Sequence, residues 1–508
     1  MKTVKNYTPH VVVFLSSMGI MIIELVASRI VAKYFGNSLY TWTGIIGVVL
    51  GGITLGNYLG GKFADRFDVR RAARTLLFIG AGLVLVILFL DALVNIALGG
   101  LSSTEHRLLL ITASLSVIGI MFFLPATALG TISPIMAKYA LEETDKIGTT
   151  VGSIYAAGSA GSIIGTFLSG FVLVPLLGIR TVIVTVAVVL ALLTLLIRGK
   201  RRIATAAAGT LCALIFFLAA HPHAGLSVFE PGSNTIYETD SMYSHITVKN
   251  QADGERVLIM DGLIHNRYDP AAPDTLLYEY ERVYREATEA FLTTRTAGGS
   301  PGEELRTLTL GGGALTFPSY LERHYPESEN IVVEIDPHVI EVAHRYFDIP
   351  RDTGIIIEIA DARRYVRGLC GEATFDIIYL DVFDSYSIPS HLTTLEFARE
   401  MQRVLKPEGV VLVNLIDIFE IGRFLGAYSR TMDEAFDEVE IFTSPHFAEK
   451  TRSTFVLAAG RDISFLRDLG TDAGRPYSTV TEGELGKRWE RNTSPLLRDH
   501  YAPVESLM

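Results

Sequence analysis

The chain has 508 residues, of which 49% are hydrophobic, and its formal net charge at pH 7 is −11. The length is sufficient for about three domains. The acidic balance, with no basic stripe interleaved with aromatics, argues against nucleic acid as a partner. The two cysteines, Cys212 and Cys370, provide neither a disulfide framework nor a thiolate cluster. The histidines show no metal-ligand spacing, so we expect no metal site.

The first part of the chain predicts a multi-pass α-helical membrane domain at residues 1–222. It is poor in charge and contains repeated apolar runs, and a helix needs about 20 such residues to cross a bilayer. The first run carries Glu24 and Arg29 and lacks a clean small-residue cleavage site, so it is interpreted as a span and not as a signal peptide. Seven spans are predicted, near residues 11–31, 41–60, 75–98, 108–130, 149–173, 179–197 and 203–220.

Three features of these spans predict how they pack. The second and fifth spans contain glycines at helical spacing, which favours close contact between helices in lipid. The fourth contains Pro125 and continues into Ser133-Pro134, which predicts a kinked or broken helix. Glu24 is an acidic residue deep in a span, which fits either an interhelical contact or a substrate pathway.

The second part of the chain has an ordinary globular composition and predicts an α/β fold. Alternating residues indicate strands at Glu238–Val248 and Arg256–Met260, joined by a turn at 252–254. These strands form a predicted small β-hairpin domain at 223–270. A helix at about 274–293 and then alternating strands and helices predict a doubly wound, Rossmann-like sheet at 271–508.

Two successive strand ends of this sheet carry residues suited to a nucleoside. The run that starts at Leu308 ends in Gly311, Gly312 and Gly313, which let a ligand approach the backbone closely. The next run ends in Glu334, twenty-one residues beyond Gly313. A carboxylate at that spacing can accept hydrogen bonds from ribose hydroxyls. The glycine stretch lacks a full GxGxxG, so the spacing favours an adenosyl-methionine-type fold over a dinucleotide enzyme.

The following two strand ends carry further carboxylates. The third ends in Asp361, placed to meet an adenine edge. The fourth ends in Asp381 and Asp384, three residues apart, which suit a cationic substrate or the abstraction of a proton. Four strand ends in this order predict an active site and not merely acidic loop ends.

These motifs resemble those of the spermidine/spermine synthases, the polyamine aminopropyltransferases. The resemblance covers roughly residues 230–460. The motifs that carry it are Ser241-Met-Tyr243-Ser244, Met260-Asp261-Gly262-Leu-Ile-His265, Tyr278-Glu279-Tyr280, Gly311-Gly-Gly-Ala314, Glu334-Ile-Asp336, Ala360-Asp361-Ala362 and Asp381-Val-Phe-Asp384.

The resemblance implies transfer of an aminopropyl group from decarboxylated S-adenosylmethionine, the co-substrate, to putrescine or a related polyamine, with methylthioadenosine as the second product. It implies that Asp381 is the general base, that Tyr278 supports it, and that Asp384 holds the far ammonium of the polyamine. Tyr243 would line the substrate entrance. Donor-binding positions implied in the same way are Gly311, Gly312, Gly313, Glu334, Asp336, Asp361, Ala362 and His265. Enzymes of this family are often dimers, so a homodimer is one expectation.

The sequence departs from the family pattern at the donor site. The aspartate of the glycine loop, implied to hold the donor's amine, is Ala314 here, and the two glutamines of the pattern are Ser244 and His265. Glu279 could replace the missing negative charge and is counted with the substrate-binding residues. Two alternatives therefore stay open: an S-adenosylmethionine-dependent methyltransferase, or a non-catalytic polyamine sensor or transporter-like module.

The membrane half resembles the N-terminal part of bacterial fused spermidine-synthase-like proteins, which implies a multi-pass location in the bacterial inner membrane. The loops at 61–74 and 198–202 are rich in lysine and arginine, so both should be cytoplasmic. With seven spans the catalytic part would then lie outside the cytoplasm, although adenosyl donors are made inside. The side on which it works stays open at this stage.

Overall fold

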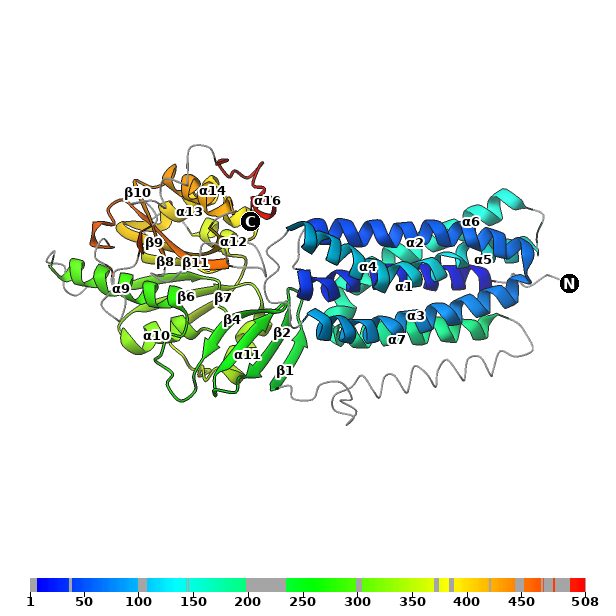
Figure 1. Ribbon diagram of the computed structural model, residues 1–508, viewed down its shortest axis with the longest axis horizontal. Coiled ribbons are helices and arrows are strands. Elements are labelled where there is room, and N and C mark those ends of the chain that lie inside the picture. Colours follow the sequence, from blue (N-terminus) through cyan, green and yellow to red (C-terminus); the bar gives the residue numbers. More distant parts are fainter. Residues whose placement is uncertain are drawn as a thin grey trace. The chain divides into compact units, whose positions relative to one another are not determined.

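The computed structural model describes residues 7–35, 39–98, 107–142, 144, 146–197, 234–297, 304–369, 374–382, 388–419, 422–443, 452–466, 469, 478–479 and 494–507. The chain divides into two compact units, coloured along the sequence in Figure 1. The helical unit comprises Met1–Ser233 with Thr239–His245, and the α/β unit comprises Asn234–Glu238 with Ile246–Met508.

The helical unit is an antiparallel bundle of apolar helices. Six stretches within the described residues are long and apolar enough to cross a membrane. The seventh predicted span, at 203–220, lies outside the described residues. The helices are α1 Thr8–Phe35, α2 Leu39–Arg66, α3 Val69–Leu98, α4 Arg107–Gly130, α5 Ile132–Leu141, α6 Ile147–Leu168, a π-helical turn at Ser169–Leu173, and α7 Val174–Leu196.

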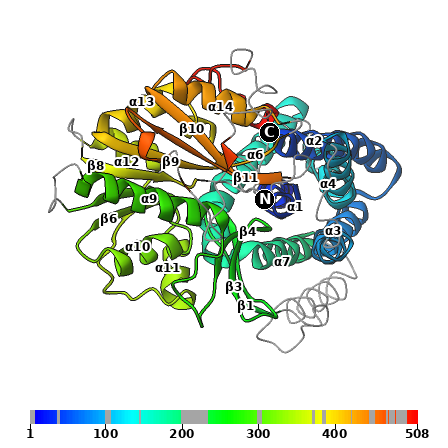
Figure 2. The ribbon, with the colours of Figure 1, turned by 60° about the vertical axis from the view of Figure 1, so that its left-hand side comes forward.

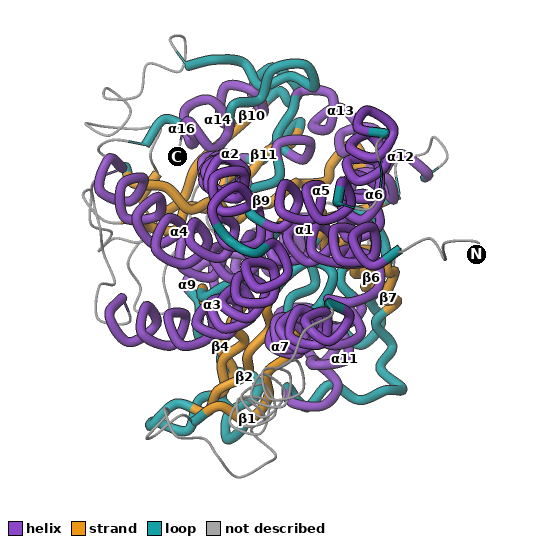
Figure 3. The backbone as a smooth tube through the Cα atoms, turned by 90° about the vertical axis from the view of Figure 1, so that its right-hand side faces the viewer, coloured by secondary structure: helices purple, strands orange, loops and turns teal. Residues whose placement is uncertain are grey.

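Glycines permit the two closest helix pairs of this unit, α2 with α4 and α1 with α6, seen end-on in Figure 3. A Cβ atom added to Gly56 would lie 2.4 Å from the carbonyl oxygen of Thr127 on α4. One added to Gly161 would lie 2.1 Å from the carbonyl oxygen of Phe14 on α1. No side chain fits at these distances, so the prediction that the glycines allow close packing in spans two and five is confirmed.

The fourth predicted span is broken, as its prolines predicted. Helix α4 ends at Gly130 and α5 begins at Ile132, with Thr131 between them. The Thr131 hydroxyl donates to the carbonyl of Ala128 at 2.6 Å. Pro134 lies in the first turn of α5, where a missing N–H is tolerated.

The α/β unit begins with a four-stranded sheet in the order β1-β2-β3-β4. Its strands are β1 Thr235–Asp240, β2 His245–Asn250, β3 Arg256–Met260 and β4 Leu263–Tyr268. The prediction of a single strand at Glu238–Val248 is wrong, because a turn separates β1 from β2. The Ser241 hydroxyl accepts from the amides of Tyr243 and Ser244, at 3.0 and 2.9 Å, and so closes this turn.

The larger sheet has eight strands within the described residues, in the order β12-β10-β11-β9-β8-β5-β6-β7. Neighbours from β7 to β9 are parallel, whereas β11 is antiparallel to both β9 and β10. The strands are β5 Arg306–Leu310, β6 Glu329–Glu334, β7 Ile356–Ile359, β8 Phe375–Leu380, β9 Leu405–Ile418, β10 Glu438–Thr443, β11 Arg452–Gly460 and β12 Ser478–Thr479. The predicted doubly wound, methyltransferase-type sheet is confirmed.

Helices cover both faces of this sheet, as Figure 2 shows. On one face lie α9 Glu279–Ala297, α10 Thr316–His324 and α11 Pro337–Tyr346, and on the other α12 Ala362–Gly368, α13 Leu395–Val404 and α14 Phe424–Asp433. The chain order reverses between β5 and its neighbour β8. Ligands of such sheets bind outside the carboxyl ends of the strands at this switch point, so the fold itself indicates where to look for a site.

Candidate active site

The end of β5 and the end of β8 meet through Gly311. Its φ is +93°, a conformation that favours glycine. A Cβ atom there would lie 2.0 Å from the carbonyl oxygen of Asp381. The glycine is therefore required by the contact between two strand ends as well as by its backbone angle. The structure thus brings together the first and fourth strand ends that the sequence singled out.

Asp381 follows β8 and is held by two donors. The Tyr280 hydroxyl donates to Oδ2 at 2.8 Å, and Asn414 Nδ2 donates to Oδ1 at 2.9 Å. Burial raises the pKa of the Asp381 carboxyl, while these two hydrogen bonds act in the opposite direction. The residue is surrounded by protein yet keeps part of its surface accessible. It is therefore a fixed carboxylate with increased basicity, as a general base requires.

The tyrosine that donates to Asp381 is Tyr280, and the supporting role of Tyr278 stays a prediction. The Tyr278 hydroxyl donates instead to the carbonyl of Ile264 at 3.2 Å, and its ring packs against that of Tyr280 with centroids 5.6 Å apart. The two tyrosines differ in their surroundings because α9 begins at Glu279, between them. Tyr280 and Tyr284, one helical turn apart, are both buried against the sheet, whereas Tyr278 precedes the helix.

Glu281 is a buried carboxylate that the sequence reasoning missed. Only 1% of its surface is exposed. It accepts from the Thr316 hydroxyl at 3.1 Å and from the Tyr278 amide at 3.3 Å. Burial raises its pKa to about 7. A glutamate three residues after the residue preceding a helix is a capping-box position, and that spacing was the available signal.

Asn266, on β4, joins Glu281 to the glycine loop. Its Oδ1 accepts from the Ala314 amide at 2.9 Å, and its Nδ2 donates to the Thr316 hydroxyl at 2.9 Å. A Cβ atom on Gly313 would lie 2.4 Å from Asn266 Oδ1. The amide therefore fills space beside the loop where the family pattern has its aspartate. Asn266 and Thr316 both line a small cavity together with Tyr280, Gly311, Gly312 and Asp381.

Glu334, at the second strand end, is hydrogen-bonded to the glycine loop. Its Oε2 accepts from the amides of Gly312 and Gly313, at 2.8 and 3.3 Å, and its Oε1 accepts from the Asp336 amide at 2.9 Å. Burial raises its pKa. Asp336 itself caps α11, since its Oδ1 accepts from the His338 amide at 2.9 Å. Its part in donor binding stays a prediction.

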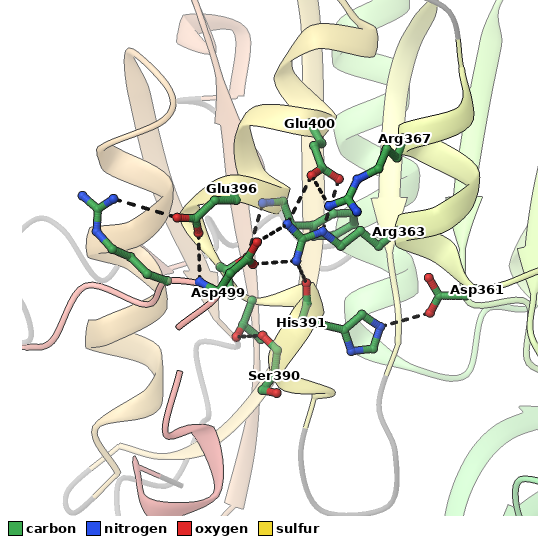
Figure 4. A network of polar contacts seen from close by, with 12 residues as sticks. Asp361, Arg363, Arg367, Ser390, His391, Glu396, Glu400 and Asp499 are labelled. Carbon is green, nitrogen blue, oxygen red and sulfur yellow. Dashed lines mark hydrogen bonds and ion pairs between the residues drawn. The ribbon is translucent and has the colours of Figure 1, made fainter. Parts of the chain in front are cut away.

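Asp361 lies at the third strand end and caps α12. One carboxylate oxygen accepts from the Arg364 amide at 2.8 Å, and the other faces His391 Nε2 at 3.0 Å. Burial acts to raise the pKa of Asp361, but the hydrogen bonds from Arg364 and His391 outweigh it and leave the pKa below its usual value. Ala362, the first residue of α12, is buried in the core. Figure 4 shows the polar network to which Asp361 and His391 belong.

Of the remaining predicted site residues, His265, Glu279 and Tyr243 lie within the described part of the chain. His265 Nδ1 lies 3.0 Å from the Leu263 carbonyl, and its charge acts to lower the pKa of Asp381. Glu279 begins α9 and is half-buried. Tyr243 belongs to the segment grouped with the helical unit, where Arg29 donates to its carbonyl. Asp384 lies outside the described residues.

Comparison with known proteins matches residues 237–461 to the spermine/spermidine synthase domain. A polyamine aminopropyltransferase of Vibrio vulnificus is 32% identical over 233 residues, which are 43% of this chain and 71% of that protein. An N-terminal histidine N-methyltransferase of Emericella nidulans is 30% identical over 231 residues, covering 42% of this chain and 39% of that protein. The crystal structure of a probable spermidine synthase from Corynebacterium glutamicum is 24% identical, with a TM-score of 0.45, and covers 54% of this chain and 99% of that one.

Proposed function

Because the chain belongs to the polyamine aminopropyltransferase family of enzymes, we propose that it transfers an aminopropyl group from decarboxylated S-adenosylmethionine to putrescine or a related amine. The products are the elongated polyamine and methylthioadenosine. The six apolar helices found within the described residues support a membrane-bound enzyme, and the bacterial inner membrane is its proposed location. The observation that carries the proposal is the part-buried Asp381 carboxylate, fixed by Tyr280 and Asn414 beside the glycine loop.

In the proposed reaction an amine nitrogen attacks the methylene carbon next to the donor's sulfonium. An ammonium group has no lone pair, so Asp381 first takes a proton from the bound amine. The neutral nitrogen then forms the new N–C bond while the C–S bond breaks. The electron pair of that bond stays on sulfur, so neutral methylthioadenosine leaves and the positive charge moves to the new secondary ammonium. Asp381 afterwards returns its proton to solvent.

Glu281 is the proposed counter-charge for the donor's terminal ammonium, in place of the expected Glu279. The family pattern has an aspartate where Ala314 is fully buried here. Glu281 supplies a carboxylate to the same region through Thr316, which lines the cavity beside Asp381. An ammonium that binds there favours the ionised form of Glu281, whose pKa burial raises to about 7. The S-adenosylmethionine carboxylate would meet a like charge, and this disfavours that donor.

The rest of the donor fits the neighbouring strand ends. In the proposed complex the ribose hydroxyls replace the loop amides as hydrogen-bond donors to Glu334. The adenine amino group donates to Asp361. The far ammonium of the polyamine would bind Asp384. The contributions of Asp336, Ala362, His265 and Tyr243 stay predictions.

Methyl transfer from S-adenosylmethionine is the second candidate function. Two observations favour it: the loop aspartate is absent, with Ala314 in its place, and the chain is similar to a histidine N-methyltransferase. Methyl transfer would use the same ribose and adenine contacts but would release adenosylhomocysteine.

Mass spectrometry of the nucleoside product distinguishes the two reactions. The full-length protein, purified in detergent, would be incubated with putrescine and with each donor in turn. We expect methylthioadenosine from the decarboxylated donor, and a loss of at least about a hundredfold in Asp381→Asn, because an amide cannot accept the proton. Adenosylhomocysteine from S-adenosylmethionine would establish methyl transfer instead. No product with either donor would refute the proposed function with this acceptor.

A further inference from the structure

A polar network outside the proposed reaction centre joins the end of the chain to the third strand end (Figure 4). Its central residue is Arg363, whose side chain is only 9% exposed. Arg363 makes a bidentate ion pair with Asp499, with N–O distances of 2.6 and 2.9 Å, and it also contacts Glu400 at 3.1 and 3.2 Å. A buried guanidinium that is satisfied in this way has a fixed position.

The same guanidinium holds the turn that carries His391. Arg363 Nη1 donates to the main-chain carbonyl of His391 at 3.0 Å. The imidazole of His391 then reaches back to Asp361, with Nε2 and Oδ2 3.0 Å apart. Because Asp361 and Arg363 are two residues apart in the chain, these contacts form a closed ring around the start of α12.

The C-terminal segment Ser494–Leu507 holds these contacts in place through Asp499. Leu497, Val504 and Leu507 are buried in the core formed with α13 and α14. Asp499, between them, accepts from the Thr394 hydroxyl at 2.7 Å as well as from Arg363. The turn that carries His391 is therefore held between α12 and the end of the chain.

We propose that His391 is a positioning residue of the donor site, which holds the Asp361 carboxylate in the orientation that accepts the adenine amino group. One oxygen of Asp361 is already committed to the Arg364 amide as a helix cap. The other oxygen has two lone pairs: the imidazole N–H occupies one, so the second faces a defined direction. Arg363 and Asp499 keep the imidazole in place. This inference rests on the proposed binding of an adenosyl donor.

The test compares two nucleosides that differ at the adenine amino group. Methylthioadenosine presents an amino donor to Asp361, whereas methylthioinosine presents a carbonyl oxygen, which a carboxylate repels. Affinities of the full-length protein would be measured by titration calorimetry. In His391→Ala we expect methylthioadenosine to bind about tenfold more weakly, equivalent to about 1.4 kcal/mol, with little change for methylthioinosine. His391→Gln keeps an amide donor and should recover most of the selectivity.

Two further variants locate the effect. Asp499→Asn weakens the ion pair with Arg363 without touching the nucleoside, and it should lower the selectivity in the same direction by a smaller factor. His500→Ala removes an exposed imidazole next to Asp499 and should bind both nucleosides as the wild type does.

An unchanged affinity ratio in folded His391→Ala, or a His391→Gln variant with selectivity as low as that of His391→Ala, would overturn the proposal. A wild-type protein that binds neither nucleoside would refute the donor assignment itself, and with it this proposal.

Discussion

Replacing Tyr280 by phenylalanine tests whether Asp381 acts as the base. The variant removes a hydroxyl that donates to Asp381 at 2.8 Å inside the protein, and it keeps the ring and its packing. A hydrogen bond to a charged group contributes about 1.5–3 kcal/mol. The loss should therefore raise the pKa of Asp381, because the ionised carboxylate loses this stabilisation and the protonated form does not.

The sign of the effect on activity follows from which form of Asp381 reacts. Only the ionised carboxylate can take the proton, so activity falls as the pH drops through its pKa. The acidic limb of the profile of kcat/KM against pH should therefore move to higher pH in Tyr280→Phe. The assay is methylthioadenosine formation, measured from about pH 5 to pH 9 with the decarboxylated donor and putrescine.

Tyr278→Phe is the matched control. Tyr278 is the neighbouring tyrosine, but its hydroxyl donates to the Ile264 carbonyl and not to Asp381. We expect its acidic limb to coincide with that of the wild type. An unmoved limb in Tyr280→Phe, or a larger shift in Tyr278→Phe, would refute the assignment of Asp381 as a base held by Tyr280.

Three more predictions follow from contacts in the structure. Gly56→Leu should destabilise the helical unit by about 1–3 kcal/mol or more, because a Cβ there lies 2.4 Å from a carbonyl of α4. The control Gly61→Leu, with open space around it, should have the melting temperature of the wild type in detergent. Gly311→Ala should lower kcat/KM at least about tenfold, since the new methyl group displaces the end of β8; wild-type kinetics would show that the strand ends do not need this contact. In the wild type, the KM for the donor should fall as the pH rises through about 7, because the ionised Glu281 carboxylate binds the donor more tightly. Glu281→Gln should abolish this dependence on pH. Identical KM profiles for both proteins would exclude Glu281 from the donor site.

Periodicity and strand-end spacing in the sequence were sufficient for the architecture. Apolar runs of membrane-spanning length predicted six helices that the structure contains, and glycine spacing predicted which of them pack closely. In the α/β unit, apolar runs that end in Gly311, Glu334, Asp361 and Asp381 predicted successive parallel strands. These inferences succeed because period and length depend on local chain geometry, which the sequence carries directly.

The partners of the site residues depended on tertiary structure. The choice of Tyr280 over Tyr278 depends on where α9 begins and on which side of it meets the sheet. Asn266 is 48 residues from Ala314 and Glu281 is 35 residues from Thr316, the loop positions that they contact, and no local pattern encodes such pairings.

The contact between His391 and Asp361 shows the same limit most clearly. The two residues are 30 positions apart, and the arginine that holds the turn is itself fixed by Asp499, 136 positions away from it. The sequence alone determined that glycines stand at the first strand end and a carboxylate at each of the next three, because strand period and turn chemistry are local properties. Only the folded chain decided which donors surround each carboxylate, because burial, pKa and orientation arise from segments that packing brings together.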